Sequence, residues 1–560
     1  MSSQSEKDPQ PARGNGQRGE AARAAGLVSL AVLCSRILGL VREMVFSRLL
    51  GASLAMDALR VAFLIPNLLR DLFAEGALSS AFVPTFTDYL RNKSRSEAWH
   101  LAGLVMSLLM MVLSAFALLL LAFPRQAMLL AAAGFADDPE KARLTAFLLQ
   151  ILSPFLLFVA LASVAMGILN ALGHYFLPAL APAFFNLAVI VSGFTLAPYL
   201  ESQGYNPAAG LALGMLAGGV LQFAVQVPLM RRNGFRFRPG LDLNHPGIRR
   251  ILRLMGPAVV GISAVQANVL ISMQMASYLE PSDGVVSWLG YAFRIIYLPI
   301  GMFGVAVGTV NLRNVSLLAA EGRQQEVRAN VCHSLRLVTL LALPSMAGML
   351  LLAEPLVRLL YEGGRFSAES TYATALALMV YAVALPAYSC QKVYVPTFYA
   401  LDDTRTPVRI SILSVAVNVV FSLTLVFLVL QPVAPRSAYL GLALGTGVSI
   451  SLQVGLLARA LRIRLGSMRA QLAPALARMA GATAVMTIGV YLLHSALGEW
   501  LSGSRWSQAL LLAACIAGGG ALYFACCLVL GVEEVKELTA GLRNRLSGRG
   551  RGASRQEGDK

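Results

Sequence analysis

The chain has 560 residues, of which 57% are apolar and only 13% are charged. A soluble protein normally carries about 25% charged residues, so this composition excludes a soluble globular domain. The net charge of +17 could suit a nucleic-acid partner, but the arginines gather in short loops and in the C-terminal tail. That distribution is typical of a membrane protein with basic cytoplasmic loops, and we expect no nucleic-acid partner.

In chain order, residues 1–24 are polar and rich in Gly, Arg, Gln and Glu, which predicts a disordered cytoplasmic tail. Apolar runs then recur to the end of the chain, each long enough to cross a hydrocarbon core of about 30 Å. We therefore predict an all-α polytopic membrane protein with about 14 transmembrane helices. The predicted spans are 26–50, 55–90 (with a break at Pro66), 98–123, 143–171, 176–199, 208–230, 250–279, 284–319, 329–353, 371–400, 408–430, 437–461, 474–496 and 506–530.

The chain also contains a weak internal repeat. Matching residues recur at one constant offset, and they are Ala171, Leu172 and Pro178 in the first copy and Ala400, Leu401 and Pro407 in the second. A parallel repeat predicts two six-helix lobes around a central cavity, with two helices added at the end. The predicted parts are an N-lobe at 25–232, a C-lobe preceded by a basic loop at 233–465, two last helices at 466–532 and a basic cytoplasmic tail at 533–560.

Loop charge predicts the orientation of the helices. The connections 91–97, 231–253 and 402–409 are strongly basic, whereas 134–141 and 280–283 on the opposite side are not. Because basic loops remain in the cytoplasm, both termini are expected there.

Several predicted spans contain charged residues, and a basic side chain at a span centre costs about 2.5–3.5 kcal/mol on insertion scales. Arg48, Asp57, Arg60 and Arg313 lie near span ends and are expected to be interfacial. The more central charges are Arg36, Arg42, Glu43, Arg70, Asp71, Glu75 and Arg294. They predict either a water-filled basic cavity or ion pairs that hold helices together, with Arg70–Glu75 as a candidate pair.

A cavity lined by arginine favours an anionic substrate, because the planar guanidinium binds phosphate through paired hydrogen bonds. The sequence has no GxxxxGK[ST] motif, no arrangement typical of a nucleophilic enzyme, and no metal-ligand spacing among its Cys and His residues. We therefore expect a transporter, not an enzyme, that has no metal or other cofactor. Its transport would depend on the membrane potential, an ion gradient, or substrate supply and removal.

Residues 35–86, SRILGLVREMVFSRLLGASLAMDALRVAFLIPNLLRDLFAEGALSSAFVPTF, are similar to the N-terminal signature of the MurJ (MviN) family. These bacterial lipid II flippases belong to the multidrug/oligosaccharidyl-lipid/polysaccharide (MOP) exporter superfamily. Further similar motifs lie at 255–266, 291–309, 343–366 and 398–410. The resemblance implies a fourteen-helix protein of the bacterial inner membrane. It would move undecaprenyl-diphosphate-linked glycopeptide from the cytoplasmic to the periplasmic leaflet by alternating access, with the lipid tail in a groove near the last two helices.

The resemblance also implies roles for individual residues. The family's diphosphate-binding arginines match Arg36, Arg42, Arg70 and Arg294. Gating, coupling or pairing roles fall on Glu43, Asp57 and Glu75. Transport would be driven by the membrane potential or an ion gradient. The expected partners of this monomer are lipid II or a related glycolipid, membrane lipids and cell-wall synthesis enzymes.

Four positions depart from the family pattern. Phe293 and Tyr297 stand where acidic residues are usual, Arg313 replaces a proline, and Glu43 stands where Asp is common. These departures leave two alternatives open. One is a flippase for another polyprenyl-diphosphate glycan, of an exopolysaccharide or O-antigen, and the other is a non-transporting membrane scaffold whose arginines are structural.

Overall fold

The computed structural model describes residues 15–72, 78–281, 283–498, 504–537 and 539–540. These residues are almost entirely helical and include no strand beyond one isolated bridge between Gly363 and Phe366. Ten of the described helical segments are long and apolar enough to cross a membrane, or eleven if the bent pair α17–α18 is one span. The prediction of an all-α polytopic membrane protein is confirmed. The number fourteen stays a prediction, because α1, α2–α3 and α12 are not among these segments.

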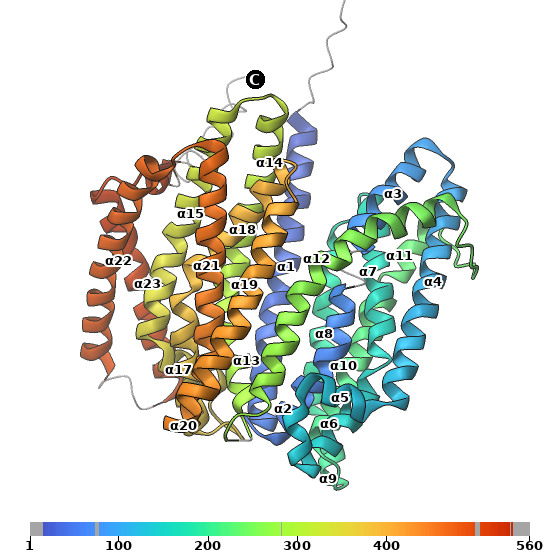
Figure 1. Ribbon diagram of the computed structural model, residues 1–560, viewed down its shortest axis with the longest axis horizontal. Helices are drawn as coiled ribbons and strands as arrows, with labels where there is room; N and C mark the ends of the chain where they lie inside the picture. The colour runs from blue at the N-terminus through green and yellow to red at the C-terminus, as the bar shows by residue number, and fades with distance from the viewer. Residues whose placement is uncertain (1–14, 73–77, 282, 499–503, 538, 541–560) are drawn as a thin grey trace, which may run out of the picture. The chain divides into compact units, whose positions relative to one another are not determined.

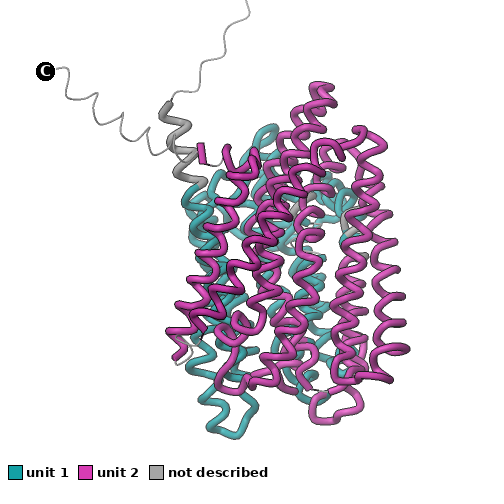
Figure 2. Tube along the Cα trace, turned by 90° about the vertical axis from the view of Figure 1, so that its left-hand side faces the viewer, with its two compact units in different colours: residues 1–49, 61–128, 142–263 teal, residues 50–60, 129–141, 264–560 magenta. Residues whose placement is uncertain are grey.

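Contacts divide the chain into two compact units (Figure 2). Unit 1 comprises the chain up to residue 49 together with 61–128 and 142–263. Unit 2 comprises 50–60, 129–141 and the chain from residue 264 onward. These units group residues by contact, whereas the predicted lobes follow the chain order, so the lobe boundaries stay a prediction.

The helices in the first half of the chain are labelled in Figure 1. They are α1 (Asn15–Leu50), α2 (Leu54–Arg70), α3 (Ser79–Asn92), α4 (Arg95–Ala122), α5 (Pro124–Ala132), α6 (Pro139–Leu152), α7 (Phe155–Ala171), α8 (Phe176–Phe194), α9 (Leu196–Ser202), α10 (Pro207–Ala224), α11 (Val227–Arg232) and α12 (Pro246–Ala276), with a 3-10 turn at Ala133–Asp137. The division between the units falls inside α2, α5, α6 and α12, and at the last residue of α1.

Two predictions about this half were wrong. Residues 15–24 are helical rather than disordered, since α1 begins at Asn15, and the stretch EAARAA (20–25) has a high helix propensity. Helix α2 does not break at Pro66 but continues to Arg70. Proline removes one backbone hydrogen bond, and the burial of neighbouring residues such as Ala62 and Ile65 offsets that loss.

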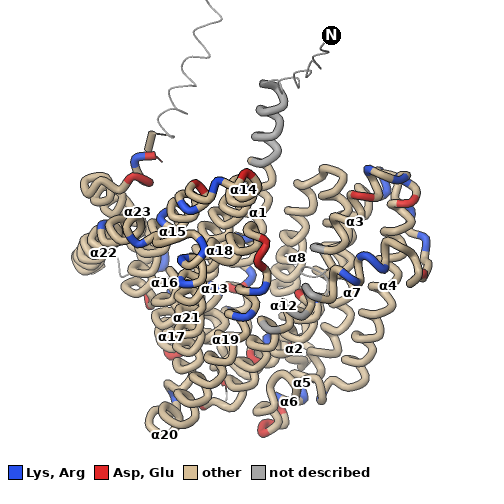
Figure 3. Tube along the Cα trace, turned by 45° about the horizontal axis from the view of Figure 1, so that its top comes forward, with Lys and Arg blue, Asp and Glu red and all other residues tan. Residues whose placement is uncertain are grey.

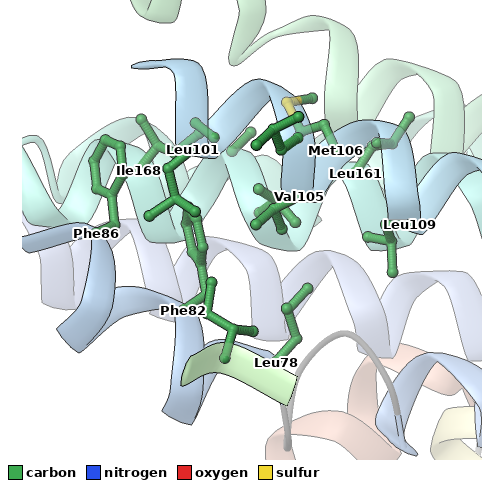
Figure 4. Close-up of a cluster of buried hydrophobic side chains, with 14 of the residues drawn as sticks. Leu78, Phe82, Phe86, Leu101, Val105, Met106, Leu109, Leu161 and Ile168 are labelled. Atoms are coloured by element: carbon green, nitrogen blue, oxygen red, sulfur yellow. The ribbon is translucent and has the colours of Figure 1, made fainter. Parts of the chain in front are cut away.

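A hydrophobic core joins α3, α4 and α7 in unit 1 (Figure 4). Phe82 and Phe86 of α3 stack with their ring centroids 5.3 Å apart. Leu101 and Val105 of α4 and Ile168 of α7 belong to the same cluster. This packing fixes the positions of α4 and of the loops beside it.

The helices of the second half are α13 (Val285–Pro299), α14 (Val305–Ala320), α15 (Gln324–Leu351), α16 (Ala353–Tyr361), α17 (Ala368–Val383), α18 (Leu385–Ala400), α19 (Arg405–Leu423), α20 (Gln431–Val433), α21 (Tyr439–Leu465), α22 (Arg469–Gly498) and α23 (Arg505–Val529). Short π segments lie at Ile300–Gly304 and Thr424–Leu430, and a 3-10 turn lies at Pro435–Ser437. Helices α22 and α23 pack side by side, and α22 also packs against α15 (Figure 1).

The predicted basic tail does not start at residue 533. Residues 533–537 form a helical turn whose Glu534 is only 1% exposed and lies 2.7 Å from Nε of Arg336 in α15. The neighbouring side chains of Val532 and Val535 are buried as well. The chain therefore stays folded past α23 because this segment adds apolar contacts and an ion pair. Residues 541–560 lie outside the described part.

Candidate functional site

Arg42, in the C-terminal third of α1, is held by a set of contacts within unit 1. Its guanidinium pairs with Glu43 at 2.6 Å and donates a hydrogen bond to Asn186 of α8 at 3.1 Å. The Asn186 amide in turn donates to the backbone carbonyl of Ser35 on α1. The rings of Phe46 and Phe185 lie 5.5 and 5.6 Å from the same guanidinium. Arg42 is thus oriented by hydrogen bonds, charge and aromatic contacts, and Glu43 is buried.

Asn186 is a site residue that the sequence analysis missed. Its signal is a polar side chain within the apolar run of α8. An amide can donate and accept at once, so Asn186 joins Arg42 to the α1 backbone. Gly193 lets the two helices approach, because a Cβ there would lie 2.5 Å from a methyl of Val45.

Arg36 lies on α1 before Arg42 and differs from it. Its side chain is half-buried. Within the described part of the chain, it makes no ion pair and no side-chain hydrogen bond. Arg48 near the end of the same helix is exposed, and its interfacial position stays a prediction. Arg36 is therefore a partly desolvated cation whose hydrogen-bonding groups are available to a ligand.

Arg70 ends α2 and pairs with the adjacent Asp71, with the closest nitrogen–oxygen distance 2.7 Å. Asn67 contacts the same carboxylate at 3.5 Å. Glu75, the predicted partner of Arg70, lies outside the described residues. The site role of Glu75 and the predicted Arg70–Glu75 pair stay predictions.

Arg294 of α13 is half-buried and, among the described residues, has no ion-pair or hydrogen-bond partner. Its neighbour Phe293 packs against the rings of Tyr297, Tyr381 and Tyr388, at centroid distances of 6.1, 5.5 and 6.1 Å. The departure from the family pattern at Phe293 therefore places an aromatic cluster, rather than a carboxylate, beside this arginine. Arg313 of α14 is exposed.

Asp57 forms a polar network in unit 2, and its predicted interfacial position stays a prediction. The carboxylate is fully buried and accepts hydrogen bonds from the backbone N–H groups of Gly284 and Ser287, at 2.8 and 2.9 Å. It also accepts from the Ser287 hydroxyl at 2.5 Å and pairs with Lys141 at 3.2 Å. Because these N–H groups begin α13, Asp57 caps that helix from another part of the chain.

Lys141 is a second site residue that the sequence analysis missed. It is 1% exposed, pairs with both Asp57 and Asp283 at 3.2 Å, and lies 4.2 Å from the ring centroid of Phe135. Its position follows from local sequence, because Asp138 caps the start of α6 through the N–H groups of Glu140 and Lys141. A lysine is rarely buried unless it is paired, so burial in this loop could not be inferred from composition alone.

Arg60 was also predicted to be interfacial, and this stays a prediction. It is half-buried, and its guanidinium lies 4.4 Å from the ring centroid of Tyr291 on α13. The Tyr291 hydroxyl donates to the carbonyl of Gly51 at 3.3 Å. The stretch 51–60 is therefore joined to α13 at several points.

Unit 2 also has an apolar cavity of about 500 Å³ between α15 and α22. Leu343 and Met346 line it from α15, and Ala480 and Thr483 line it from α22. Among the described residues, no group of three or more His, Cys, Asp or Glu side chains could hold a metal ion.

The fold first defines a class. A solved structure of an inward-facing multidrug resistance MATE family transporter of the MOP superfamily matches with a TM-score of 0.61 at 15% identity, over 77% of this chain and 94% of that one. The chain therefore has the fold of these polytopic membrane transporters.

The family follows from closer matches. The family profile described as "Lipid II flippase MurJ" matches residues 46–512. A probable lipid II flippase MurJ of Vibrio cholerae is 33% identical over 92% of this chain and 97% of its own length. The lipid II flippase MurJ of Burkholderia cenocepacia is 33% identical over 91% and 98%. A solved structure of lipid II flippase MurJ in an inward closed conformation matches with a TM-score of 0.74 at 25% identity, over 92% and 99%.

The chain belongs to the lipid II flippase MurJ family. It is a multi-pass protein of the bacterial inner membrane.

Proposed function

We propose that this protein moves lipid II, the undecaprenyl-diphosphate-linked peptidoglycan precursor, from the cytoplasmic to the periplasmic leaflet of the inner membrane. Its membership of the MurJ family supports this substrate. The protein acts as a transporter and not as an enzyme, needs no cofactor, and works by alternating access as a monomer. The membrane potential or an ion gradient drives the transport.

The proposal rests on the burial and the polar contacts of Arg36 and Arg294. Both are half-buried in helices that are otherwise mainly apolar, and neither has an ion-pair or hydrogen-bond partner among the described residues. A cation in a span is costly unless something compensates it, and a diphosphate offers several acceptor oxygens. Arg36 and Arg294 therefore bind the diphosphate headgroup directly.

Arg42 and Arg70 complete the headgroup set in a different way. Each already touches a carboxylate, Glu43 for Arg42 and Asp71 for Arg70. Such pairs lower the cost of an arginine in a span and fix the direction of its guanidinium. These arginines meet the diphosphate in a preset orientation, and Glu43 offsets the charge of Arg42 while Asp71 offsets that of Arg70.

Asp57 has a gating role in this proposal. Its network joins the start of α2, the start of α6 and the start of α13. Transport requires these helix ends to separate and meet again, and the loss of this network changes the balance between conformations. Glu75 is proposed to take part in coupling or pairing near Arg70.

The lipid tail is proposed to occupy the apolar cavity between α15 and α22. Its lining by Leu343, Met346 and Ala480 suits an isoprenoid chain, and its volume is about 500 Å³. Both termini are cytoplasmic in this proposal. The ion pair between Lys141 and Asp283 brings 134–141 and 280–283 together, as required by the prediction that both loops lie on the same side.

A complementation experiment tests the function. The gene is expressed in cells depleted of their own lipid II flippases, and lipid II in each leaflet is measured. We expect the intact protein to restore export, and Arg36→Ala and Arg294→Ala to abolish it at equal protein level. Arg48→Ala, which changes an exposed arginine of the same helix, is the matched control and retains export.

Failure of the intact protein to restore export would contradict the lipid II assignment. Full activity of both Arg36→Ala and Arg294→Ala would contradict the headgroup site and favour a scaffold. A role in exopolysaccharide or O-antigen export predicts rescue only of cells that lack the flippase of that glycan.

A further inference from the structure

The loop between α11 and α12 lies along α4 in unit 1. Arg95 donates to the carbonyl of Asn233 at 2.8 Å, and the Trp99 and Phe235 rings lie 5.4 Å apart. Further along, the N–H of Gly240 donates to the hydroxyl of Ser107 at 3.2 Å. These contacts occur in the same order on both segments. Residues 233–240, here called the α4 loop, therefore follow α4 from its first turn onward.

The α4 loop separates two cavities of different character. Phe235 and Phe237 line an apolar cavity of about 780 Å³. Arg238 lines a smaller polar cavity of about 270 Å³ together with Trp99 and His100. Arg236 lines both cavities. Aromatic and basic side chains alternate along the α4 loop, and the two cavities meet at Arg236.

The larger cavity has the size and lining of a lipid-chain site. Its volume lies within the range of about 300–1,000 Å³ that is typical of ligand pockets. Met106, Met110 and Leu161 form its wall, and Figure 4 shows Met106 and Leu161 in the α4–α7 core. Flexible methionine side chains adapt to an alkyl chain.

Basic groups that are not neutralised surround this apolar space. Within the described part of the chain, Arg231, Arg236 and Arg238 make no ion pair and no side-chain hydrogen bond. Nearby acidic residues are engaged elsewhere, because Asp88 pairs with Arg250 and Glu97 pairs with Lys93. Further basic residues gather where α3 meets α4 (Figure 3). The polar cavity therefore has a net positive charge.

His245 lies near the polar cavity, and its burial, together with the neighbouring His100, lowers the pKa of its ring. A lowered pKa favours the uncharged ring, so the positive charge of the cavity does not depend on His245. Arg236 and Arg238 supply that charge, because a guanidinium stays protonated.

The same loop presents apolar side chains to its surroundings. Phe237 is 44% exposed, and Leu241 and Leu243, which follow it, are 58% and 56% exposed. Exposed apolar residues beside arginines are typical of segments that lie in the headgroup region of a bilayer. A loop immersed in water would gain nothing from exposing them.

We propose that the α4 loop and α4 form a binding site for an anionic phospholipid. One acyl chain occupies the apolar cavity, and the lipid phosphate accepts hydrogen bonds from Arg236 and Arg238. The site uses none of the residues proposed to bind the transported headgroup. It holds a resident lipid of the cytoplasmic leaflet and ties the loop to the membrane surface.

The test uses the full-length protein purified in detergent and lipid binding measured by native mass spectrometry. The probes are phosphatidylglycerol and phosphatidylcholine with identical acyl chains. We expect phosphatidylglycerol to bind more tightly. Since one basic residue near a membrane surface contributes about fivefold in affinity, R236Q lowers phosphatidylglycerol binding about fivefold and R236Q/R238Q about 25-fold.

Two controls separate this site from general charge and from a free anion. R232Q removes an exposed arginine of the same region that lines neither cavity, and it leaves binding unchanged. Soluble glycerol phosphate, which has the headgroup chemistry without the chains, does not compete at equal concentration. Equal binding of the two lipids, an equal loss in R232Q, or full competition by glycerol phosphate would each overturn the proposal.

A further variant tests the apolar cavity. V227W fills the space that Val227 lines and lowers phosphatidylglycerol binding, while the thermal unfolding midpoint confirms that the variant is folded. Unchanged binding by a folded V227W protein would overturn the assignment of the acyl chain to this cavity.

Discussion

Buried charge is compensated differently at Asp57 than at Arg36 and Arg294. Asp57 has two backbone donors, one hydroxyl donor and one ammonium partner, and is fully buried. Arg36 and Arg294 are only half-buried, and the described residues offer them no ion-pair partner. The first charge is compensated by the protein itself, whereas the proposed function assigns compensation of the other two to the substrate.

Under the proposed function, this difference separates charges that stabilise the fold from charges that bind the substrate. A fully buried ion that lost its partners would be strongly destabilising, so a network such as that of Asp57 contributes to the stability of this conformation. A cation that keeps part of its hydration can exchange water for phosphate when the substrate arrives. Variants of the two groups should therefore affect different measurements.

The largest stability effect is expected for Asp57→Ala. The change removes one carboxylate partner of Lys141 and leaves the N–H groups of Gly284 and Ser287 without their acceptor. Breaking a buried pair from one side typically costs about 3–5 kcal/mol, so the free energy of unfolding should fall by that order. Thermal unfolding of the purified protein measures it.

Ser287→Ala is a milder change that serves as the control for Asp57→Ala. It removes only the hydroxyl donor to Asp57 and keeps the backbone bonds and the Lys141 pair, so a loss of about 1 kcal/mol is expected. If Asp57→Ala were no more destabilising than Ser287→Ala, the network would not have the structural role assigned to it.

The sequence was sufficient to locate the charged helices and the fold class. The apolar runs predicted an all-α polytopic protein, and the arginines within them could be identified without any structure. The resemblance to the MurJ family added Asp57 and the four arginines as a set. These features depend on local composition and motifs, which can be read directly from the sequence.

The partners of those charges could not be predicted, because each comes from a distant part of the chain. Asn186 reaches Arg42 from α8, and Lys141 reaches Asp57 from the start of α6. Asp57 itself was placed at an interface, since a position near a span end says nothing about which loop covers it. The loop at 134–141 was interpreted only by its net charge, although its lysine is the buried partner.

The next largest effect is expected when the arginine at position 36 or 294 is replaced by lysine. Arg36→Lys and Arg294→Lys keep the positive charge but lose the paired hydrogen bonds to a diphosphate. Hydrogen bonds to charged groups contribute about 1.5–3 kcal/mol, so lipid II export should fall by about 10–100-fold in each variant. Export in flippase-depleted cells and thermal unfolding are measured together.

An unchanged unfolding midpoint is part of that prediction, since Arg36 and Arg294 contribute few polar contacts to the described structure. A loss of stability comparable to that of Asp57→Ala would place these arginines with the structural charges instead. Arg48→Lys, at an exposed position, should change neither measurement.

Arg42 shares features with both the structural charges and the charges proposed to bind substrate. Asn186→Ala tests whether its fixed orientation matters for transport. The variant removes the amide that holds Arg42 and the bond to the Ser35 carbonyl, while the Glu43 pair remains. We expect export to fall about tenfold, equivalent to about 1.4 kcal/mol, because the guanidinium loses its fixed orientation. Asn186→Gln, which retains the amide on a longer side chain, should recover part of the activity. Unchanged export in Asn186→Ala would show that this orientation has no part in transport.

The smallest effect is expected from replacing either of the two glutamates that lie near Arg336. Glu534 is 1% exposed and lies 2.7 Å from Arg336, whereas the side chain of Glu533 is 71% exposed and lies 3.5 Å from it. Glu534→Gln should lower the free energy of unfolding by about 1 kcal/mol, because a half-buried arginine loses its closest partner. Glu533→Gln should lie near zero, as is typical of exposed pairs. Equal effects of the two would show that net charge, rather than compensation of a buried group, holds residues 533–537 on α15, and the contrast drawn from Asp57 would then not extend to this end of the chain.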